Sequence, residues 1–126
     1  MSDSRGVALA EIEVKKKADE ARAYGNTQLA DALQATIVTT AAQREAALVP
    51  RPPPENESGG DQRRRRMKEL EAERHRNRGN EVEAARCLLT RSELAEWSER
   101  MDEFSQVLQD YTARVRAETA RLRGSG

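Results

Sequence analysis

Two residues with the chemistry of a nucleophile, a base or a metal ligand occur only once each in the sequence: His75 and Cys87. Catalysis by a cysteine nucleophile needs a base within hydrogen-bond reach and a third group that orients the base. His75 and Cys87 stand on opposite sides of the helix break that residues 77–80 predict, and the sequence offers neither a convincing third partner. We therefore expect His75 to be exposed among arginines and Cys87 to be a small, buried residue.

Other motifs for catalysis or cofactor binding are missing from the sequence. It has no glycine-rich phosphate loop, no nucleophile elbow and no set of histidines and cysteines at metal-ligand spacing. A single cysteine also excludes an internal disulfide and a multi-cysteine metal site. Carboxylates are plentiful, but their pattern predicts solvated helix faces. The expectations are therefore no enzymatic activity, no cofactor, no metal and no small-molecule substrate.

The stretch RRRRMK, residues 63–68, is the second feature whose side chains could bind a ligand. Residues 61–78 carry eight basic and four acidic side chains, although the whole chain balances 22 of each. Basic side chains bind nucleic-acid phosphates with release of counterions, and the stretch also fits the loose pattern of a nuclear localisation signal. Glu69 follows at helical spacing from Arg65 and Arg66, so local ion pairs on a solvated helix are the simpler interpretation. The candidate phosphate contacts are Arg63, Arg64, Arg65, Arg66 and Lys68.

Three of the four aromatic residues stand seven positions apart, at Trp97, Phe104 and Tyr111. With Leu94 as position a of a heptad, eight of the nine a and d positions up to residue 122 are apolar, and Glu118 is the exception. This spacing is typical of a helix that packs lengthwise against another helix. We call these positions the seam, which comprises Leu94, Trp97, Met101, Phe104, Leu108, Tyr111, Val115 and Leu122.

The positions beside the seam argue against parallel pairing of two copies. The e positions after the aromatics are serine or threonine, so the opposite charges of parallel dimers are missing. Large aromatic side chains fit best against small ones, and residues 27–48 are rich in alanine. The β-branched run 36–40 lowers helix propensity, but alanine surrounds it. We expect one helix over 27–48 to pack antiparallel against 92–122, with part of the longer helix uncovered.

Proline and glycine divide the chain into segments. Residues 49–60, VPRPPPENESGG, hold all four prolines, which lack the amide hydrogen that a helix or central strand uses. Gly25-Asn26 predicts a helix stop or a kink. The expected segments are an alanine-rich helical part (1–48), a linker (49–60), a basic helix (61–78), an amphipathic heptad helix (79–123) and a tail (124–126).

Capping residues predict where the later helices begin. Asp61 has the side chain of a helix N-cap, and Asn80 with Glu83 has the spacing of a capping box. Thr90 with Glu93 repeats that spacing. This repeat leaves open whether a new helix starts at Thr90 or one helix continues through it.

The composition indicates a thin hydrophobic core. Leu, Ile, Val and Phe supply only 20 of the 126 residues, and 19 of the 46 apolar residues are alanine. Such a monomer has marginal stability, which a binding partner can raise. The expected fold is all-α: an elongated helical hairpin or small bundle with a coiled-coil-like seam, a proline-rich hinge and a basic helix.

These features favour a non-catalytic structural or adaptor subunit that acts by helix–helix contact within a larger assembly, with a protein partner or by self-association. The alternative is an accessory nucleic-acid-binding protein with Arg63–Arg66 on the phosphate backbone. No apolar stretch reaches the roughly 18 residues of a membrane span, and the N-terminus lacks the apolar core of a secretion signal. We expect no membrane contact and an intracellular location, cytoplasmic by default, with the nucleus as an alternative location if the source is eukaryotic.

Overall fold

The computed structural model describes residues 5–52 and 55–125, and over these residues the chain forms six helices and no strand. The prediction of an all-α fold is confirmed. None of these helices is long and apolar enough to cross a membrane. Parts of the expected segments lie outside the described residues, namely 1–4, 53–54 and 126. The helices are α1 (Arg5–Ala23), α2 (Thr27–Gln34), α3 (Ala41–Ala47), α4 (Gly59–Asn77), α5 (Glu81–Cys87) and α6 (Arg91–Ser125).

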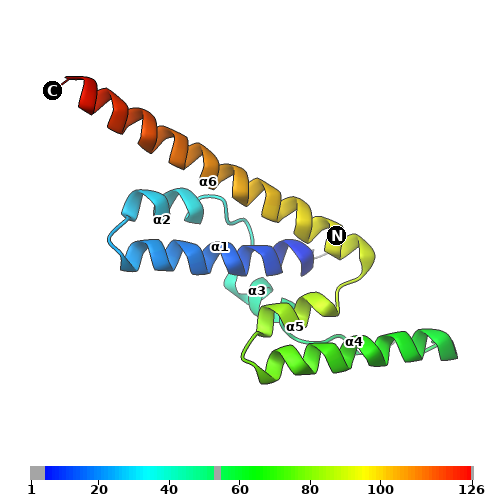
Figure 1. Cartoon of the computed structure of the whole chain (residues 1–126). Helices are drawn as coiled ribbons and strands as arrows, with labels where there is room; N and C mark the ends of the chain where they lie inside the picture. The colour runs from blue at the N-terminus through cyan, green and yellow to red at the C-terminus, as the bar shows by residue number, and fades with distance from the viewer. Residues whose placement is uncertain (1–4, 53–54, 126) are drawn as a thin grey trace.

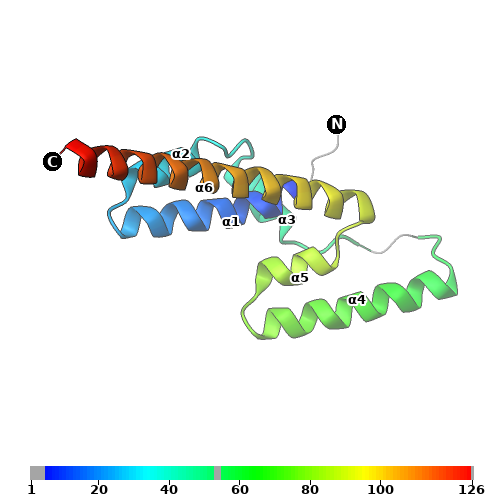
Figure 2. The same cartoon turned by 45° about the horizontal axis from the view of Figure 1, so that its top comes forward.

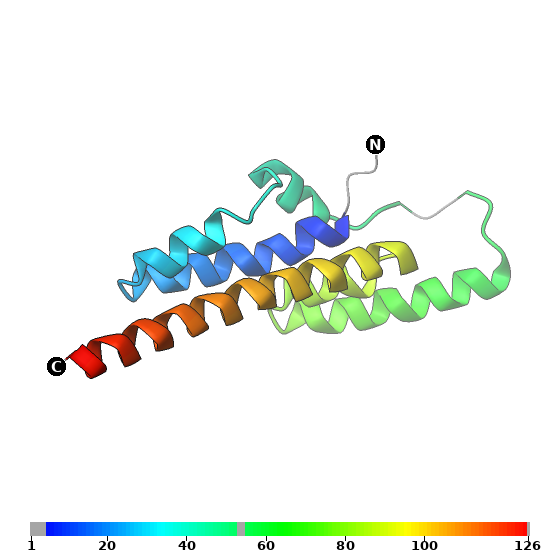
Figure 3. The same cartoon turned by 90° about the horizontal axis from the view of Figure 1, so that it is seen from above.

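The molecule is elongated, and α6 is its longest element (Figures 1 and 2). The antiparallel pair α1 and α2 lies along one side of α6, and α4 and α5 form a second hairpin near the start of α6. The short helix α3 packs against both α1 and α5 through Ala47. Seen from above, the C-terminal end of α6 runs on beyond α2 (Figure 3).

Both hairpins turn at a Gly-Asn pair. Gly25 and Gly79 have φ angles of 84° and 81°, which glycine adopts without steric cost. In each turn the asparagine amide donates to the carbonyl five residues earlier, and the glycine amide donates to the carbonyl three residues earlier. This is the Schellman arrangement, which satisfies the last carbonyls of a helix and reverses the chain. The predicted helix stop at Gly25-Asn26 is confirmed, and Asn26 also caps α2 by accepting the amide hydrogen of Leu29.

The main partner of α6 is α1, and the two helices run in the same direction (Figure 1). Three contacts define their register, and residue numbers increase along both helices from one contact to the next. They are Gly6 with Trp97, Glu11 with Arg100 and, just past α1, Asn26 with Tyr111. At the first pair the backbones approach closely. A Cβ on Gly6 would overlap the carbonyl oxygen of Glu93 and would lie 2.8 Å from the Trp97 amide nitrogen.

Residues 27–48 do not form one helix, so that prediction is wrong. The chain leaves the helix after Gln34 and resumes it only at Ala41, and the β-branched run lies between. Thr36 ends α2 by donating its hydroxyl to the Leu33 carbonyl, and Thr40 starts α3 with a capping box to Gln43. The β-branched residues therefore decide the local structure in spite of the alanines around them.

The large side chains of α6 do meet small ones, but most of these belong to α1 rather than to 27–48. The buried alanines of α1 are Ala8, Ala10, Ala18 and Ala21. The helix α2 adds Leu29 and Leu33, and it lies antiparallel to α6 as predicted, since Asn26 meets Tyr111 and Thr36 meets Arg100.

The hydrophobic core consists of two clusters. One joins α1, α3 and α5 with Trp97 of α6, and the other joins α1, α2 and the middle of α6. Their most buried members are Ala8, Leu9, Ala47, Ala85 and Leu89 in the first cluster and Val14, Ala18, Leu33 and Phe104 in the second.

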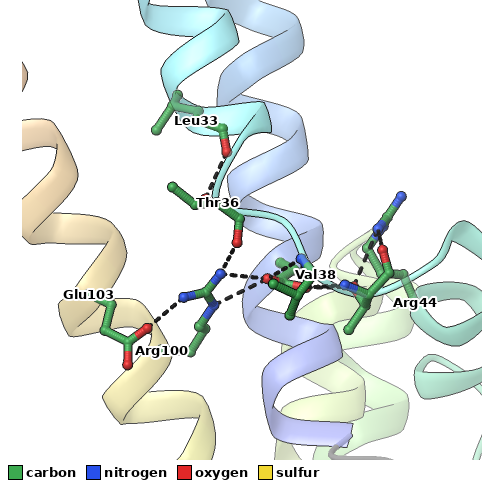
Figure 4. Close-up of polar contacts among 8 residues, drawn as sticks. Leu33, Thr36, Val38, Arg44, Arg100 and Glu103 are labelled. Carbon is green, nitrogen blue, oxygen red and sulfur yellow. Dashed lines mark hydrogen bonds and ion pairs between the residues drawn. The ribbon is translucent and has the colours of Figure 1, made fainter.

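A buried carboxylate lies between the two clusters. Glu11 is fully buried in α1, and it accepts hydrogen bonds from the amides of Val38 and Thr39, from the Thr39 hydroxyl at 2.6 Å and from Arg100 at 2.7 Å. Arg100 also donates to the Thr36 carbonyl. Figure 4 shows Arg100 reaching from α6 toward Thr36 and Val38. These contacts connect α1, the non-helical segment 35–40 and α6 at one point.

The protonation of Glu11 follows from this environment. Burial favours the neutral acid and would raise the pKa of Glu11. The hydrogen bonds from Thr39, from Arg100 and from the Val38 amide all favour the carboxylate, and their combined effect lowers the pKa below its ordinary value. Glu11 is therefore ionised and paired at neutral pH.

The later helix starts differ in part from the predictions. The cap of α4 is Ser58, three residues before the predicted cap Asp61. Asn80 precedes α5 but makes no side-chain cap bond. Thr90 and Glu93 do form the reciprocal capping box, so a new helix starts after Thr90 and the segment 79–123 contains two helices. Whether the linker acts as a hinge stays a prediction.

Replacing Glu11 should destabilise the protein in a pH-dependent way. Glu11→Ala removes the buried carboxylate that pairs with Arg100 and leaves the Val38 and Thr39 amides without their acceptor, and we expect a loss of about 3–5 kcal/mol of unfolding free energy at pH 7. Because the folded-state pKa of Glu11 is lowered, its contribution is present above about pH 4.3 and is lost as the pH falls toward the folded-state value. Urea unfolding followed by circular dichroism, at pH 7 and at pH 3.5, measures both effects.

Glu11→Gln and Glu20→Gln serve as matched variants in that experiment, since Glu20 is exposed on the same helix. The stability gap between wild type and Glu11→Gln should narrow in acid, while Glu20→Gln should stay within about 0.5 kcal/mol of wild type. A gap for Glu11→Gln of the same size at both pH values would contradict the ionised, paired state of Glu11.

Candidate functional site

The seam serves mainly as an internal contact. Five of its eight residues are buried or half-buried against α1, α2, α3 and α5, namely Trp97, Met101, Phe104, Leu108 and Tyr111. The other three are exposed, namely Leu94, Val115 and Leu122. The aromatic row is therefore part of the molecule's own core, and only the two ends of the seam are open to a partner.

Tyr111 marks the point where α6 leaves the bundle. Its hydroxyl donates to the side-chain oxygen of Asn26 at 3.1 Å, and the guanidinium of Arg114 lies 5.9 Å from its ring centre. Every residue from 112 to 124 is exposed. We call residues 112–124 the α6 arm. A shallow groove of about 410 Å³ begins where α2 meets the arm, and it is lined by Gln28, Asp31, Ala32, Tyr111, Arg114, Val115 and Glu118.

The basic stretch lies on α4, and one of its arginines is held firmly. Arg65 donates to Glu57 in the linker at 2.8 Å and to Glu69 at 2.6 Å, and both carboxylates raise the pKa of Arg65. Arg66 also lies within ion-pair distance of Glu69, so the predicted local pairing is confirmed. The exposed candidates for phosphate contact are Arg63, Arg64, Arg66 and Lys68.

The surface around these arginines carries charges of both signs. A groove of about 800 Å³ runs between α4 and the linker. Its charged lining comprises the basic Arg51, Arg64, Arg65, Arg66, Lys68 and Arg76 and the acidic Glu57, Asp61, Glu69 and Glu73. Successive residues on a helix are about 100° apart, so the stretch spreads its cations around α4 and does not align them. Phosphate binding by this stretch stays a prediction.

His75 and Cys87 meet in the α4–α5 hairpin, contrary to the expectation that they would lack a shared partner. Glu71 is one turn before His75 on α4, and one ligand atom from each of Glu71, His75 and Cys87 lies within 4.8 Å of the other two. Glu71 is exposed, whereas His75 and Cys87 are half-buried, so His75 is less exposed than predicted. The i, i+4 spacing of Glu71 and His75 was the available sequence signal. The fold-back of α5 onto α4 could not be seen in the sequence.

Electrostatics at Cys87 favour the neutral thiol. Burial raises the pKa of the Cys87 thiol, and the Glu71 carboxylate raises it further, while Arg86 opposes both effects. Arg86 itself forms a 2.7 Å ion pair with Glu83. Its guanidinium also lies 5.4 Å from the ring centre of Trp97, a cation–π contact that links α5 to α6.

No family model matches the chain, and the searches of curated proteins and of solved structures find no match either.

The structure predicts that truncating seam residues has a graded effect on stability. Phe104 is 7% exposed and Leu122 is 63% exposed. We expect Phe104→Ala to cost about 3–5 kcal/mol because it leaves a cavity in the core, and Leu122→Ala to change stability by less than about 0.5 kcal/mol. Urea unfolding of both variants measures the difference. Equal destabilisation would contradict this placement of the seam.

Proposed function

We propose that this chain is a non-catalytic adaptor subunit that docks the α6 arm against an acidic, amphipathic helix of a different protein. The observation that carries the proposal is the continuation of the apolar seam past the end of the molecule's own core. Val115 and Leu122 keep the heptad spacing of the buried seam residues, yet both are exposed, at 41% and 63%.

The arm has little helical stability of its own. Isolated helices shorter than about 12–15 residues are marginal in water, and the arm spans 112–124 with no described helix covering it. The arm gains order from its continuity with the packed part of α6. A partner helix that covers Val115 and Leu122 would supply the tertiary contacts that stabilise most protein helices.

The charge of the arm favours a different protein over a second copy of this chain. The arm contains four arginines and one glutamate. Two copies paired through their arms would bring these arginines together, which is unfavourable. An acidic partner helix would complement them and would also speed the encounter. The groove between α2 and the arm offers the partner helix a place to start, in line with α2.

The rest of the molecule would fix the direction in which the arm points. Arg100 bonds to Glu11 and to the Thr36 carbonyl, and Tyr111 bonds to Asn26. These contacts hold α6 from its third turn to the start of the arm. A rigidly held base lowers the entropy that the arm loses on binding, which suits a subunit that sets the position of one protein against another.

A face-specific cross-linking experiment tests the proposal. The photo-reactive residue benzoyl-phenylalanine replaces Leu122 in the full-length chain in its own cells, and a control chain carries it at Ala120, on the opposite face of α6. We expect one discrete adduct with a protein of another mass from position 122 and none from 120. Adding Val115→Lys to the Leu122 probe should reduce the adduct at least tenfold without changing the melting temperature.

Two results would contradict the proposal. An adduct at twice the mass of this chain would show that the arm pairs with a second copy. Equal adducts from positions 122 and 120 would show that the seam face plays no part in the contact.

Nucleic-acid binding through α4 remains the alternative function. Its favourable feature is the exposure of Arg63, Arg64, Arg66 and Lys68. Affinity that rests on phosphate contacts falls steeply as salt rises. Such binding would not involve the face of α6 that carries Val115 and Leu122, so it would leave the cross-linking pattern unexplained.

A further inference from the structure

We propose that Glu71, His75 and Cys87 form a binding site for one divalent transition-metal ion of the zinc class. The three side chains come from two helices, and one ligand atom of each lies within 4.8 Å of the others. This proposal does not rest on the adaptor function, because the site is in the α4–α5 hairpin and the α6 arm takes no part in it.

The ligand types fit this class of ion. Zinc in proteins is bound by thiolate, imidazole and carboxylate groups in tetrahedral sites. A thiolate beside an imidazole favours zinc-class ions over magnesium or calcium, which take oxygen ligands. On binding, Cys87 would coordinate as the thiolate and its proton would pass to solvent. The fourth tetrahedral position would then be left to water.

The distances require only a small adjustment. Bond lengths of about 2.0–2.3 Å to zinc place neighbouring donor atoms roughly 3.3–3.8 Å apart, so the cluster would have to contract by up to about 1–1.5 Å. Glu71 is exposed and its side chain is flexible, so its rotation can supply this movement. Its exposure also gives an ion a path from solvent to the two half-buried ligands.

His75 supplies an independent reason to expect a ligand. Its Nδ1 atom is buried and has no hydrogen-bond partner among the described residues. Most buried polar atoms in proteins have a hydrogen-bond partner, and an exception calls for a physical explanation. Coordination of the ion through Nδ1 would remove this cost and would fix the orientation of the ring.

The hairpin also has a structural use for the ion. Among its 19 residues, α4 buries only Ala72. Apolar contact with α5 is therefore slight for a helix of this length. A metal bound by two residues of α4 and the last residue of α5 would hold the two helices together, as structural metals do in small domains with thin cores.

The Gly79 turn brings the ligands together. The amides of Arg78 and Asn80 both donate to the His75 carbonyl, at 3.1 and 2.9 Å, so the turn closes directly on a ligand residue. The chain then reverses at Gly79 and α5 runs back along α4, which brings its last residue beside the Glu71–His75 face.

Calorimetric titration of ZnCl₂ into the full chain, free of affinity tags and reduced, tests the site. We expect saturation at one ion per chain. Cys87→Ser and His75→Gln should weaken binding by at least about tenfold to a hundredfold, and Glu71→Gln should weaken it in the same direction. Glu73→Gln is the matched control, because Glu73 is on the same helix outside the cluster, and it should bind like wild type.

Co²⁺ provides a second readout that identifies the ligands. Its absorption spectrum should show a thiolate-to-metal band with wild type and with Glu73→Gln, and Cys87→Ser should lose that band. Circular dichroism confirms that each variant keeps its helices. The proposal is overturned if no saturable one-to-one binding occurs, or if Cys87→Ser and His75→Gln bind zinc as tightly as wild type does, which would show adventitious surface binding only.

Discussion

The architecture of this chain depends on the ion pair between Glu11 and Arg100. A fully buried carboxylate is tolerated only when it is paired and its other lone pairs accept hydrogen bonds. Glu11 meets both conditions by recruiting Arg100 from α6 and two amides from the segment 35–40. Those amides are available because the segment is not helical. One interaction thus fixes the parallel register of α1 and α6 and holds the segment that connects α2 to α3.

The functional proposal follows from that register. Because Gly6 near the start of α1 lies against Glu93 and Trp97, most of the extra length of α6 lies at its far end. The helix α6 has 35 residues and α1 has 19, and residues 112–124 extend about 20 Å past Tyr111 at 1.5 Å per residue. These residues are the α6 arm. Its apolar positions continue a seam whose middle part is already used in the core.

Much of this could be read from the sequence, and the failures have physical causes. The Gly-Asn stop rests on a local rule, and the structure agrees with it. The Thr90–Glu93 spacing left the start of a new helix open, and the structure shows that start. Coiled-coil packing of the seam stays a prediction. The prediction that 27–48 is the main partner of the seam is wrong because α1 and 27–48 are both rich in alanine, and composition does not show which of them packs better against the seam. The choice of α1 depends on Gly6, which allows the backbones to approach, and on Glu11, whose charge looks like that of any solvated glutamate in the sequence.

The Glu71–His75–Cys87 cluster was missed for a related reason. Its members are close only because α5 folds back along α4, and that contact depends on the turn at Gly79 and on the burial of Ala72. The sequence indicated a break at this position but not the direction in which the chain leaves it. Long-range pairs of this kind need a tertiary structure, whereas the i, i+4 pair of Glu71 and His75 alone is common on solvated helices.

Hydrogen–deuterium exchange along α6, measured by mass spectrometry on the isolated chain at low concentration, shows whether one end of α6 is anchored in the core while the other is a free arm. We expect slow exchange for amides in 97–111 and fast exchange for 113–123, because only the first part is held by tertiary contacts. Uniform slow exchange along the whole helix would contradict this expectation, since the arm would then already be covered without a partner.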